Sequence, residues 1–458
     1  MTTAVETFEA LRRRLTGALA VPGEPLHAEL ATGFNVAIAA TPAAVVEARD
    51  ARDVAETVRF AAATGRAVAV QATGHGLAGP LDGAILVHTR RLDECVVHPD
   101  GWARVGAGVR WQQVLDAAAP HGLAPLCGSA PGVGVVGYTT GGGLGPVART
   151  FGWASDRVRA IEIVTGDGVA RRVTAVDEPE LFWGVRGGKG ALGVVTALEF
   201  DLVPLPSLYA GALYFAGADA SVVVHRWREW SSALPPEATT SLALLQLPPM
   251  PGVPEPLAGT FTVAVRFAWT GAPESGEAVL APLRAAAAPL IDAVQTIPYA
   301  AIGMVHADPP GPMPVLEETD LLSSLPAEAV DALLAVAGPD ARSPQVIVEL
   351  RQLGGALAAE PAHPSALCHR DAAFVLTVIG VPAPPVADAI GPHAAALRSA
   401  LAPWATGGAL PNHGAAAGQE RIARSYDPAT LARLTSLAER YDPANVLRAG
   451  QVPLRSAA

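Results

Sequence analysis

The segment from Gly132 to Gly145, GVGVVGYTTGGGLG, is half glycine and constrains the fold more than any other feature of the chain. Its first six residues match the pattern G-x-G-x-x-G, which in a Rossmann domain directly follows a strand and opens a helix that faces a dinucleotide. Here Pro131 precedes the first glycine, and proline is a poor last residue for a central parallel strand because it lacks a backbone N–H. Asp156 lies at about the spacing of a ribose-binding acid, but no βαβ unit is recognisable between them. The pattern therefore disfavours a nicotinamide-type Rossmann loop.

Two further glycine-rich loops flank this segment in the sequence. They are ATGHGLAG, residues 72–79, and RGGKGALGVV, residues 186–195. Successive glycines let main-chain N–H groups approach a phosphate or a flat ring closely, because no Cβ stands in the way. Three such loops in one chain indicate a cofactor that lies along all of them.

The remaining sequence changes character at Pro206. Before it, short strands alternate with amphipathic helices, and Asp53 is expected to cap a helix that ends at Gly65. After it, strand-like runs alternate with alanine-rich helices, which predicts an antiparallel sheet covered by helices on one face. The clearest of these runs are residues 208–216, 260–269 and 345–353.

Length and charge limit the class of protein. A chain of 458 residues is too long for one ordinary core and suits two domains or one large composite unit. The net charge of −11 argues against a nucleic-acid partner, whose phosphates need a basic face. No run approaches the ~20 apolar residues of a membrane span, and the N-terminus lacks an apolar signal core, so we expect a cytoplasmic protein. The cysteines Cys95, Cys127 and Cys368 are too widely spaced for a metal site or a disulfide framework.

Seven motifs that include these loops follow one another in a characteristic order. They occupy residues 53–76, 102–115, 122–158, 180–196, 346–357, 368–374 and 441–447. In this order they resemble the flavoproteins of the vanillyl-alcohol oxidase superfamily, and within it the berberine-bridge-enzyme-like branch. The resemblance spans most of residues 41–452 and is weakest between 206 and 341.

The resemblance implies an α+β fold in two parts. An FAD-binding domain of the PCMH type is expected to form from both ends of the chain, residues 1–205 and 405–458. Residues 206–404 are expected to form an inserted substrate domain, in which an antiparallel sheet covered by helices lies over the isoalloxazine ring.

The resemblance also implies that FAD is covalently attached through His75. In this family the histidine of the first loop is commonly bonded to the C8 methyl group of the flavin, and imidazole is a suitable nucleophile near neutral pH. The alternative is a histidine that only hydrogen-bonds the cofactor. Some relatives add a second bond from a cysteine, but Ala130 occupies that position here. Cys127 lies three residues earlier, up to ~10 Å away along an extended chain, so we expect a single link.

The other residues that the resemblance places at the cofactor come from the loops and from the C-terminal segment. They are Thr73, Gly74, Gly76, Leu77, Pro131, Gly132, Val133, Gly137, Tyr138, Gly142, Gly143, Gly145, Asp156, Val195, Asn412 and Asn445. The third loop departs from the usual RGGGGNFG at Lys189, the only lysine of the chain, and at Ala191 and Leu192. Its remaining glycines are expected to preserve the loop.

The catalytic base is not evident from the family pattern. Many relatives place a tyrosine two residues before the asparagine that corresponds to Asn412, but Leu410 stands there in this chain. Plant-type relatives use a glutamate from the inserted domain. That position aligns near Ala359, beside Glu360, which is a weak candidate because a shift of one residue turns a strand side chain to the other face.

Strand periodicity supplies independent catalytic candidates. In residues 345–353, Glu349 and Arg351 share the face opposite the apolar side chains, and in residues 260–269 Arg266 does the same. These three side chains point either to the flavin or to water, where they would form a solvated ion pair. Our catalytic candidates are therefore Tyr138, Glu349, Arg351 and Asn412, whereas we interpret His306, His363 and His369 as structural.

These inferences imply an FAD-dependent oxidoreductase. We expect an oxidase that removes two electrons from an alcohol, amine or reduced ring in a small organic molecule, such as a specialised metabolite or a sugar, with dioxygen as acceptor. Two alternatives remain open: a flavin dehydrogenase with a non-oxygen acceptor, and a flavin-containing scaffold or cyclase without net redox turnover, which the missing tyrosine at Leu410 favours. A nicotinamide dehydrogenase is the most remote alternative.

Overall fold

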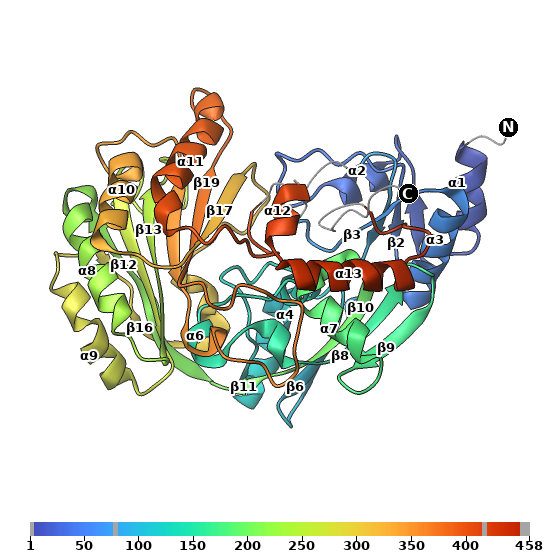
Figure 1. Cartoon of the computed structure of the whole chain (residues 1–458), viewed down its shortest axis with the longest axis horizontal. Coiled ribbons are helices and arrows are strands. Elements are labelled where there is room, and N and C mark those ends of the chain that lie inside the picture. Colours follow the sequence, from blue (N-terminus) through green and yellow to red (C-terminus); the bar gives the residue numbers. More distant parts are fainter. Residues whose placement is uncertain (1–3, 77–80, 415–418, 449–458) are drawn as a thin grey trace.

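The computed structural model describes residues 4–76, 81–414 and 419–448, which form two lobes side by side (Figure 1). The first lobe contains the described residues up to 206 together with 419–448. The second lobe contains residues 207–406, and residues 407–414 connect the two. The fold is therefore α+β, and the first and last described segments of the chain lie in the same lobe.

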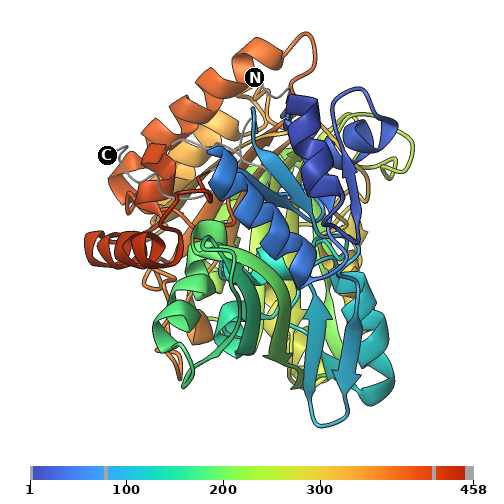
Figure 2. The same cartoon turned by 90° about the vertical axis from the view of Figure 1, so that its right-hand side faces the viewer.

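The first lobe is built on two sheets. One has the order β1 (Ala18–Ala20), β2 (Ala44–Glu47), β4 (Ile85–His88) and β3 (Val68–Gln71), with β2, β4 and β3 parallel. The other is antiparallel in the order β5 (Cys95–His98), β6 (Trp102–Gly106), β10 (Gly193–Asp201), β8 (Val158–Thr165) and β9 (Ala170–Thr174). Figure 2 turns this lobe toward the viewer, with the blue N-terminal helices above the green and teal strands of the second sheet.

Short helices connect and cover these sheets. They are α1 (Ala4–Arg12), α2 (Pro25–Ala31), α3 (Ala51–Thr64), α4 (Trp111–Ala118), α5 (Val135–Thr140), α6 (Ala148–Phe151) and α7 (Pro179–Gly188). A small pair of strands, β7 (Leu123–Ala124) and β11 (Val203–Pro204), precedes the second lobe. In the described part of the chain no helix is long and apolar enough to cross a bilayer.

The second lobe is one antiparallel sheet with helices on one face, as the sequence predicts (Figure 1). Its strands are β12 (Ser207–Ala216), β13 (Ala238–Gln246), β14 (Phe261–Trp269), β15 (Ile291–Asp292), β16 (Gln295–Pro298), β17 (Leu316–Leu322), β18 (Ile347–Gln352) and β19 (Phe374–Gly380), in the order β15-β12-β14-β13-β18-β19-β17 with β16 also on β12. The helices are α8 (Ala220–Ser232), α9 (Pro273–Arg284), α10 (Ala327–Ala337) and α11 (Ala387–Leu401). One core contains Val263 and Val265 of β14, Val348 and Leu350 of β18, and Trp227 of α8. The predicted apolar faces of β14 and β18 are thus confirmed.

The C-terminal segment leaves the sheet of the second lobe beside β17 and returns to the first lobe. Ala405 bridges to Leu322 of β17, and the chain then forms α12 (Gln419–Arg424) and α13 (Pro428–Tyr441). Leu434 and Leu437 of α13 join the main core of the first lobe. The N–H of Val68 donates to the carbonyl of Val446 at 2.7 Å, which adds the C-terminal segment to the start of β3.

The predicted cap of α3 is wrong. The helix begins at Ala51, and the carboxylate of Asp50 accepts from the N–H of Asp53 at 2.9 Å. Asp53 is instead fully buried, and its carboxylate accepts from the N–H groups of Thr16, Gly17 and Arg49. Both acids have the side chain that a cap needs, and only the tertiary contacts with the N-terminal segment decide between them.

Arg149 joins the two lobes from α6. Its side chain is buried, and its guanidinium donates to the carbonyls of Ala238 at 2.8 Å and Leu234 at 3.1 Å, and also to that of Leu353. All three acceptors belong to the second lobe and are satisfied through this one side chain. A buried carbonyl left without a donor is costly, so Arg149 fixes the position of the lobes relative to each other.

We predict that Arg149→Met lowers the free energy of unfolding by about 3 kcal/mol, because methionine fills the volume but leaves buried carbonyls unpaired. Urea unfolding followed by far-UV circular dichroism measures the effect. The matched control is Arg226→Met on α8, whose side chain is half exposed and lies 3.7 Å from Glu229; it should change stability by less than ~0.5 kcal/mol. Equal stability of the two variants would contradict the role assigned to Arg149.

Candidate active site

The three glycine-rich loops converge at Lys189. A Cβ built on Gly76 of the first loop would lie 3.6 Å from Lys189 Nζ, and a Cβ on Gly141 of the second loop would lie 2.8 Å from Lys189 Cε. The side chain of Asn412 lies beside the same glycine, because a Cβ built on Gly141 would be 2.1 Å from Asn412 Oδ1. Nδ2 of Asn412 donates to the carbonyl of Tyr138 at 2.6 Å. Segments more than 300 residues apart in the sequence numbering therefore meet at Lys189.

The glycines of these loops serve two different purposes. Around Gly132, Gly137 and Gly190, a Cβ would meet no atom of the described chain within 4 Å, so these glycines face open space. By contrast, a Cβ on Gly143 would lie 2.6 Å from the ring of Tyr138, and one on Gly145 would lie 2.0 Å from the carbonyl oxygen of Cys127. The first set borders open space beside these loops, which we call the groove, where backbone is accessible to a phosphate or a flat ring. The second set permits close contact within the protein.

Gly142 belongs to the second set, because it has φ +106° and a Cβ there would lie 3.0 Å from the Leu367 side chain. The predicted cofactor glycines are thus brought together in the fold. At Gly142, Gly143 and Gly145, however, the position of a Cβ is blocked by other atoms of the protein. Sequence patterns do not distinguish these uses, since both require the same residue.

His75 is held at the edge of the groove by two neighbours. Its imidazole stacks on Phe34 with ring centroids 3.9 Å apart and an interplanar angle of 15°, and its Nδ1 lies 2.8 Å from Thr73 Oγ1. Burial, and then the charge of Arg110, lower the pKa of His75 to about 4, so the ring is neutral at pH 7. Gly74 has φ +73°, and a Cβ there would lie 2.3 Å from the Cα of Gly33, so glycine is required for this loop to approach.

Phe34 had no signal in the sequence, because it lies outside every motif and reaches His75 only through the fold. Leu77, also predicted at the cofactor, lies outside the described residues.

Several other predicted cofactor residues have contacts of their own within the protein. The carboxylate of Asp156 pairs in bidentate fashion with Arg370, at 2.7 and 2.9 Å. Val195 is buried in the core of the first lobe, and Asn445 forms a turn after α13 with φ 51°. Arg370, from the motif at residues 368–374, is a partner that the sequence did not reveal.

Pro131 and Val133 lie at the start of the second loop, where the two lobes meet. The carbonyl of Val133 accepts from the N–H of Trp111 at 3.1 Å, and a Cβ on Gly303 would lie 2.9 Å from the Pro131 ring. Residues 299–305, which contain Gly303, belong to the second lobe. The second glycine loop is thereby supported from both sides.

Cys127 and Tyr138 lie together beneath the second loop. Cys127 is fully buried, and burial raises the pKa of its thiol to about 12. Burial likewise raises the pKa of Tyr138 well above its usual value, so the phenol stays protonated at neutral pH. The Tyr138 hydroxyl is buried and has no hydrogen-bond partner among the described residues. Tyr138 is thus a potential hydrogen-bond donor rather than a base.

The second lobe contributes a buried ion cluster on the face of its sheet opposite the helices. The Glu349 carboxylate accepts from Arg266 Nη1 at 2.6 Å, Arg351 Nε at 2.7 Å and Ser241 Oγ at 2.8 Å. The side chains of Arg266 and Glu349 are only 6% and 5% exposed, so this is not a solvated ion pair. Burial works to raise the pKa of Glu349, but Arg351 and Arg266 outweigh it and hold that pKa well below its usual range. Glu349 is therefore ionised and is poorly suited to accept a proton.

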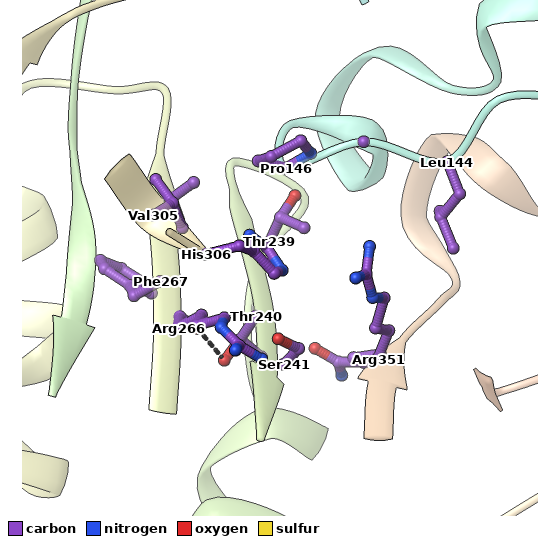
Figure 3. Close-up of a pocket in the computed structure, with 13 residues that line it drawn as sticks. Leu144, Pro146, Thr239, Thr240, Ser241, Arg266, Phe267, Val305, His306 and Arg351 are labelled. Atoms are coloured by element: carbon purple, nitrogen blue, oxygen red, sulfur yellow. Dashed lines mark hydrogen bonds between the residues drawn. The ribbon is translucent and has the colours of Figure 1, made fainter. Parts of the chain in front are cut away.

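A small pocket, partly open to solvent, lies between this cluster and the second glycine loop. Figure 3 shows Leu144 and Pro146 on one side, with Arg266, His306 and Arg351 around the space and Arg351 extending from β18 toward the loop. His306 Nε2 lies 3.5 Å from Glu349 Oε1, and within the described chain neither ring nitrogen makes a hydrogen bond. Burial, followed by Arg266 and Arg351, lowers the pKa of His306 to about 4. This neutral, pocket-lining imidazole was interpreted as structural from the sequence.

The remaining candidates lie outside this pocket. Leu410, at the position of the expected tyrosine, is buried in an apolar cluster with Leu144 and Leu353. Glu360 is exposed on a loop. The His369 ring contacts the carbonyl of Arg424 at 2.8 Å, consistent with a structural role.

Comparison with known proteins agrees with this geometry. Residues 42–174 match the family model of the FAD binding domain. The (R)-6-hydroxynicotine oxidase of Paenarthrobacter nicotinovorans is 35% identical over 179 residues, which cover 38% of this chain and 39% of that protein. The matched segment thus spans about two fifths of the relative.

Two solved structures resemble nearly the whole chain. The 6-hydroxy-D-nicotine oxidase of Arthrobacter nicotinovorans has a TM-score of 0.83 at 24% identity and covers 95% of this chain and 97% of its own. BBE-like 1 of Physcomitrella patens has a TM-score of 0.85 at 18% identity, with coverage of 99% and 98%. At such identities these likenesses establish the fold. The chain therefore carries an FAD binding domain within residues 42–174, and its fold is that of 6-hydroxy-D-nicotine oxidase and BBE-like 1.

Proposed function

We propose that the protein is an FAD-dependent oxidase that removes two electrons from a small organic substrate and transfers them to dioxygen. The observation that carries this proposal is the convergence of three glycine loops and Asn412 on one groove, next to a pocket that holds buried arginines and a neutral histidine. Oxidases that act on nicotine derivatives are among the relatives by sequence and by fold. A cytoplasmic location remains part of the proposal.

The groove fits the cofactor in its shape and its chemistry. Gly132, Gly137 and Gly190 leave backbone accessible, and Lys189 supplies a cation beside Gly76. When bound there, FAD would supply an acceptor for hydride from the substrate and pass the electrons on. Asn412, fixed through the Tyr138 carbonyl, would hold the C-terminal segment against the same groove.

We propose that His75 carries the covalent link to FAD. Its imidazole is neutral, and its contacts with Phe34 and Thr73 fix the ring plane. The new bond replaces one N–H of the imidazole and one C–H of the methyl group at C8, and overall the two hydrogens reduce dioxygen to hydrogen peroxide. Ala130 and the protonated thiol of Cys127 favour this single link.

In the pocket, His306 is the side chain that we propose takes the substrate proton, because its ring nitrogens make no hydrogen bond among the described residues, although its pKa of about 4 makes it a weak base at pH 7. It is neutral at pH 7, and the ionised Glu349 at 3.5 Å would stabilise the imidazolium that forms. Arg351, which extends into the pocket, would orient the substrate as a hydrogen-bond donor. Glu349 acts in this scheme as a positioning residue for Arg266 and Arg351.

Acid precipitation of the purified protein is expected to leave the yellow flavin in the pellet. His75→Ala should release the flavin into the supernatant, because no imidazole remains to bond the C8 methyl group. Absorbance of both fractions measures this outcome, and mass spectrometry of the flavin peptide locates the link. His363→Ala is a suitable control, since that residue is exposed on a loop. Retention of the flavin in the His75 variant would overturn the proposed attachment.

Two glycine substitutions should distinguish a glycine that borders the cofactor groove from one that is needed for packing of the protein. Gly137→Val fills open space, so we expect flavin content to fall at least about tenfold, while the melting temperature of flavin-free protein changes little. Gly145→Ala forces a Cβ against the Cys127 carbonyl and should destabilise flavin-free protein by ~1–3 kcal/mol. Flavin absorbance per protein and urea unfolding measure the two effects. A normally loaded Gly137→Val variant would show that the groove does not hold the cofactor.

A converted substrate should bleach the flavin in the absence of oxygen, and admission of air should restore the colour rapidly in stopped-flow measurements. If the reduced flavin is reoxidised slowly by air but rapidly by a quinone or dye, the protein is a flavin dehydrogenase rather than an oxidase. Conversion without any bleaching would support the scaffold or cyclase alternative, which the absence of a tyrosine at Leu410 keeps open.

A further inference from the structure

We propose that the substrate of this enzyme carries a carboxylate, which binds to Arg351 and Arg266 in the pocket between the lobes. The inference rests on the proposed function for what happens to the substrate, but the binding itself follows from the pocket alone. This proposal predicts that the pocket does not favour a protonated amine.

The ion cluster in the pocket has an excess of positive charge. Arg266 and Arg351 share a single carboxylate, because Oε1 of Glu349 accepts from Arg266 and Oε2 accepts from Arg351. One positive charge is therefore not balanced by Glu349. In a buried setting an unbalanced charge is costly unless a partner of opposite sign arrives.

The surrounding charges act mainly on neighbours of the cluster. Asp308 is the one further acid that acts on Arg351 among the described residues. Arg421 acts on Glu317, and Lys189 and Arg421 act on His413, while burial raises the pKa of Glu317. His306 and His413 are neutral at pH 7, because burial lowers the pKa of each to about 4 and about 3. This basic site lies in a chain of net charge −11.

Hydrogen-bond donors are also left over in the pocket. Nε of Arg266 and the one N–H of the neutral His306 ring are buried donors that make no hydrogen bond within the residues described, and the other ring nitrogen of His306 is an acceptor without a donor there. Arg351 uses its Nε for Glu349 and extends its guanidinium toward the loop of Leu144 and Pro146 (Figure 3). A carboxylate has the acceptor lone pairs that such donors need, and arginine binds it in a fork geometry.

A protonated amine fits this environment poorly. It would add a positive charge beside two arginines and offer donors where donors are already in excess. A neutral group could accept hydrogen bonds but would leave the charge unbalanced. Among the three classes, a carboxylate answers both observations.

The test uses three probes that differ only at one end: phenylacetate, phenylacetamide and 2-phenylethylammonium. Isothermal titration calorimetry on the flavin-loaded protein measures the binding of each. We expect phenylacetate to bind at least about tenfold more tightly than the other two, in the range of charge-assisted hydrogen bonds. Arg351→Met should abolish this preference, whereas Arg351→Lys should retain part of it, because the charge stays while the fork is lost.

Arg226→Met is the matched control, since it removes an arginine from the exposed face of α8 and should leave the preference unchanged. The proposal is overturned if the three probes bind equally, if the ammonium probe binds most tightly, or if phenylacetate does not bind at millimolar concentration. It is also overturned if Arg351→Met keeps the preference for phenylacetate unchanged. Far-UV circular dichroism and flavin content show whether each variant is folded.

The outcome is separable from that of the proposed function. If the protein binds flavin and a neutral or cationic substrate bleaches it, the proposed oxidase activity is retained and only the proposed substrate class is wrong. Preference for phenylacetate in a protein that never binds flavin would retain the anion site and remove the oxidase.

Discussion

The close approach of backbone at Gly141 to Gly145 is the constraint on which the rest of the structure depends. There the main chain passes against the Tyr138 ring, the Cys127 carbonyl and the Asn412 side chain, with no room for a Cβ. This approach lets one loop contact the floor of the first lobe, the C-terminal segment and, at Leu144 and Pro146, the pocket of the second lobe. A larger residue at these positions would separate the parts that form the groove.

Burial of charge is the second determinant of the site. Arg149 satisfies carbonyls of the second lobe from the first, while Arg266, Glu349 and Arg351 form a cluster on the inner face of the sheet. Arg149 is satisfied by fixed backbone acceptors and therefore holds structure. The cluster leaves donors unpaired, and such groups are retained in proteins where a ligand completes them. Arg149, whose donors are bound by backbone carbonyls, thus belongs to the scaffold, whereas Arg266 and Arg351 belong to the proposed binding site.

Much of the site could be predicted because its chemistry is local in sequence. The glycine loops, His75 with Thr73, and the alternation that places Glu349 and Arg351 on one face of β18 are each readable within ten residues. The catalytic role of Glu349 stays a prediction from strand periodicity, whereas its low pKa is set by Arg351, two residues away, and by Arg266, which is 83 residues away in sequence. Phe34 was overlooked and His306 was interpreted as structural, because neither belongs to a motif and each acquires its contacts from a neighbour that only the fold supplies.

The sequence by itself determined the fold class, the order of the loops and the residue types that an FAD site needs, since glycine content and strand periodicity act through local backbone geometry. Only the tertiary structure decided which glycines face open space and which contact the protein, that Asp50 rather than Asp53 caps α3, and that Asp156 is held by Arg370. It also decided the charge of the pocket, because pKa values and hydrogen-bond satisfaction depend on burial and on partners brought together from distant segments.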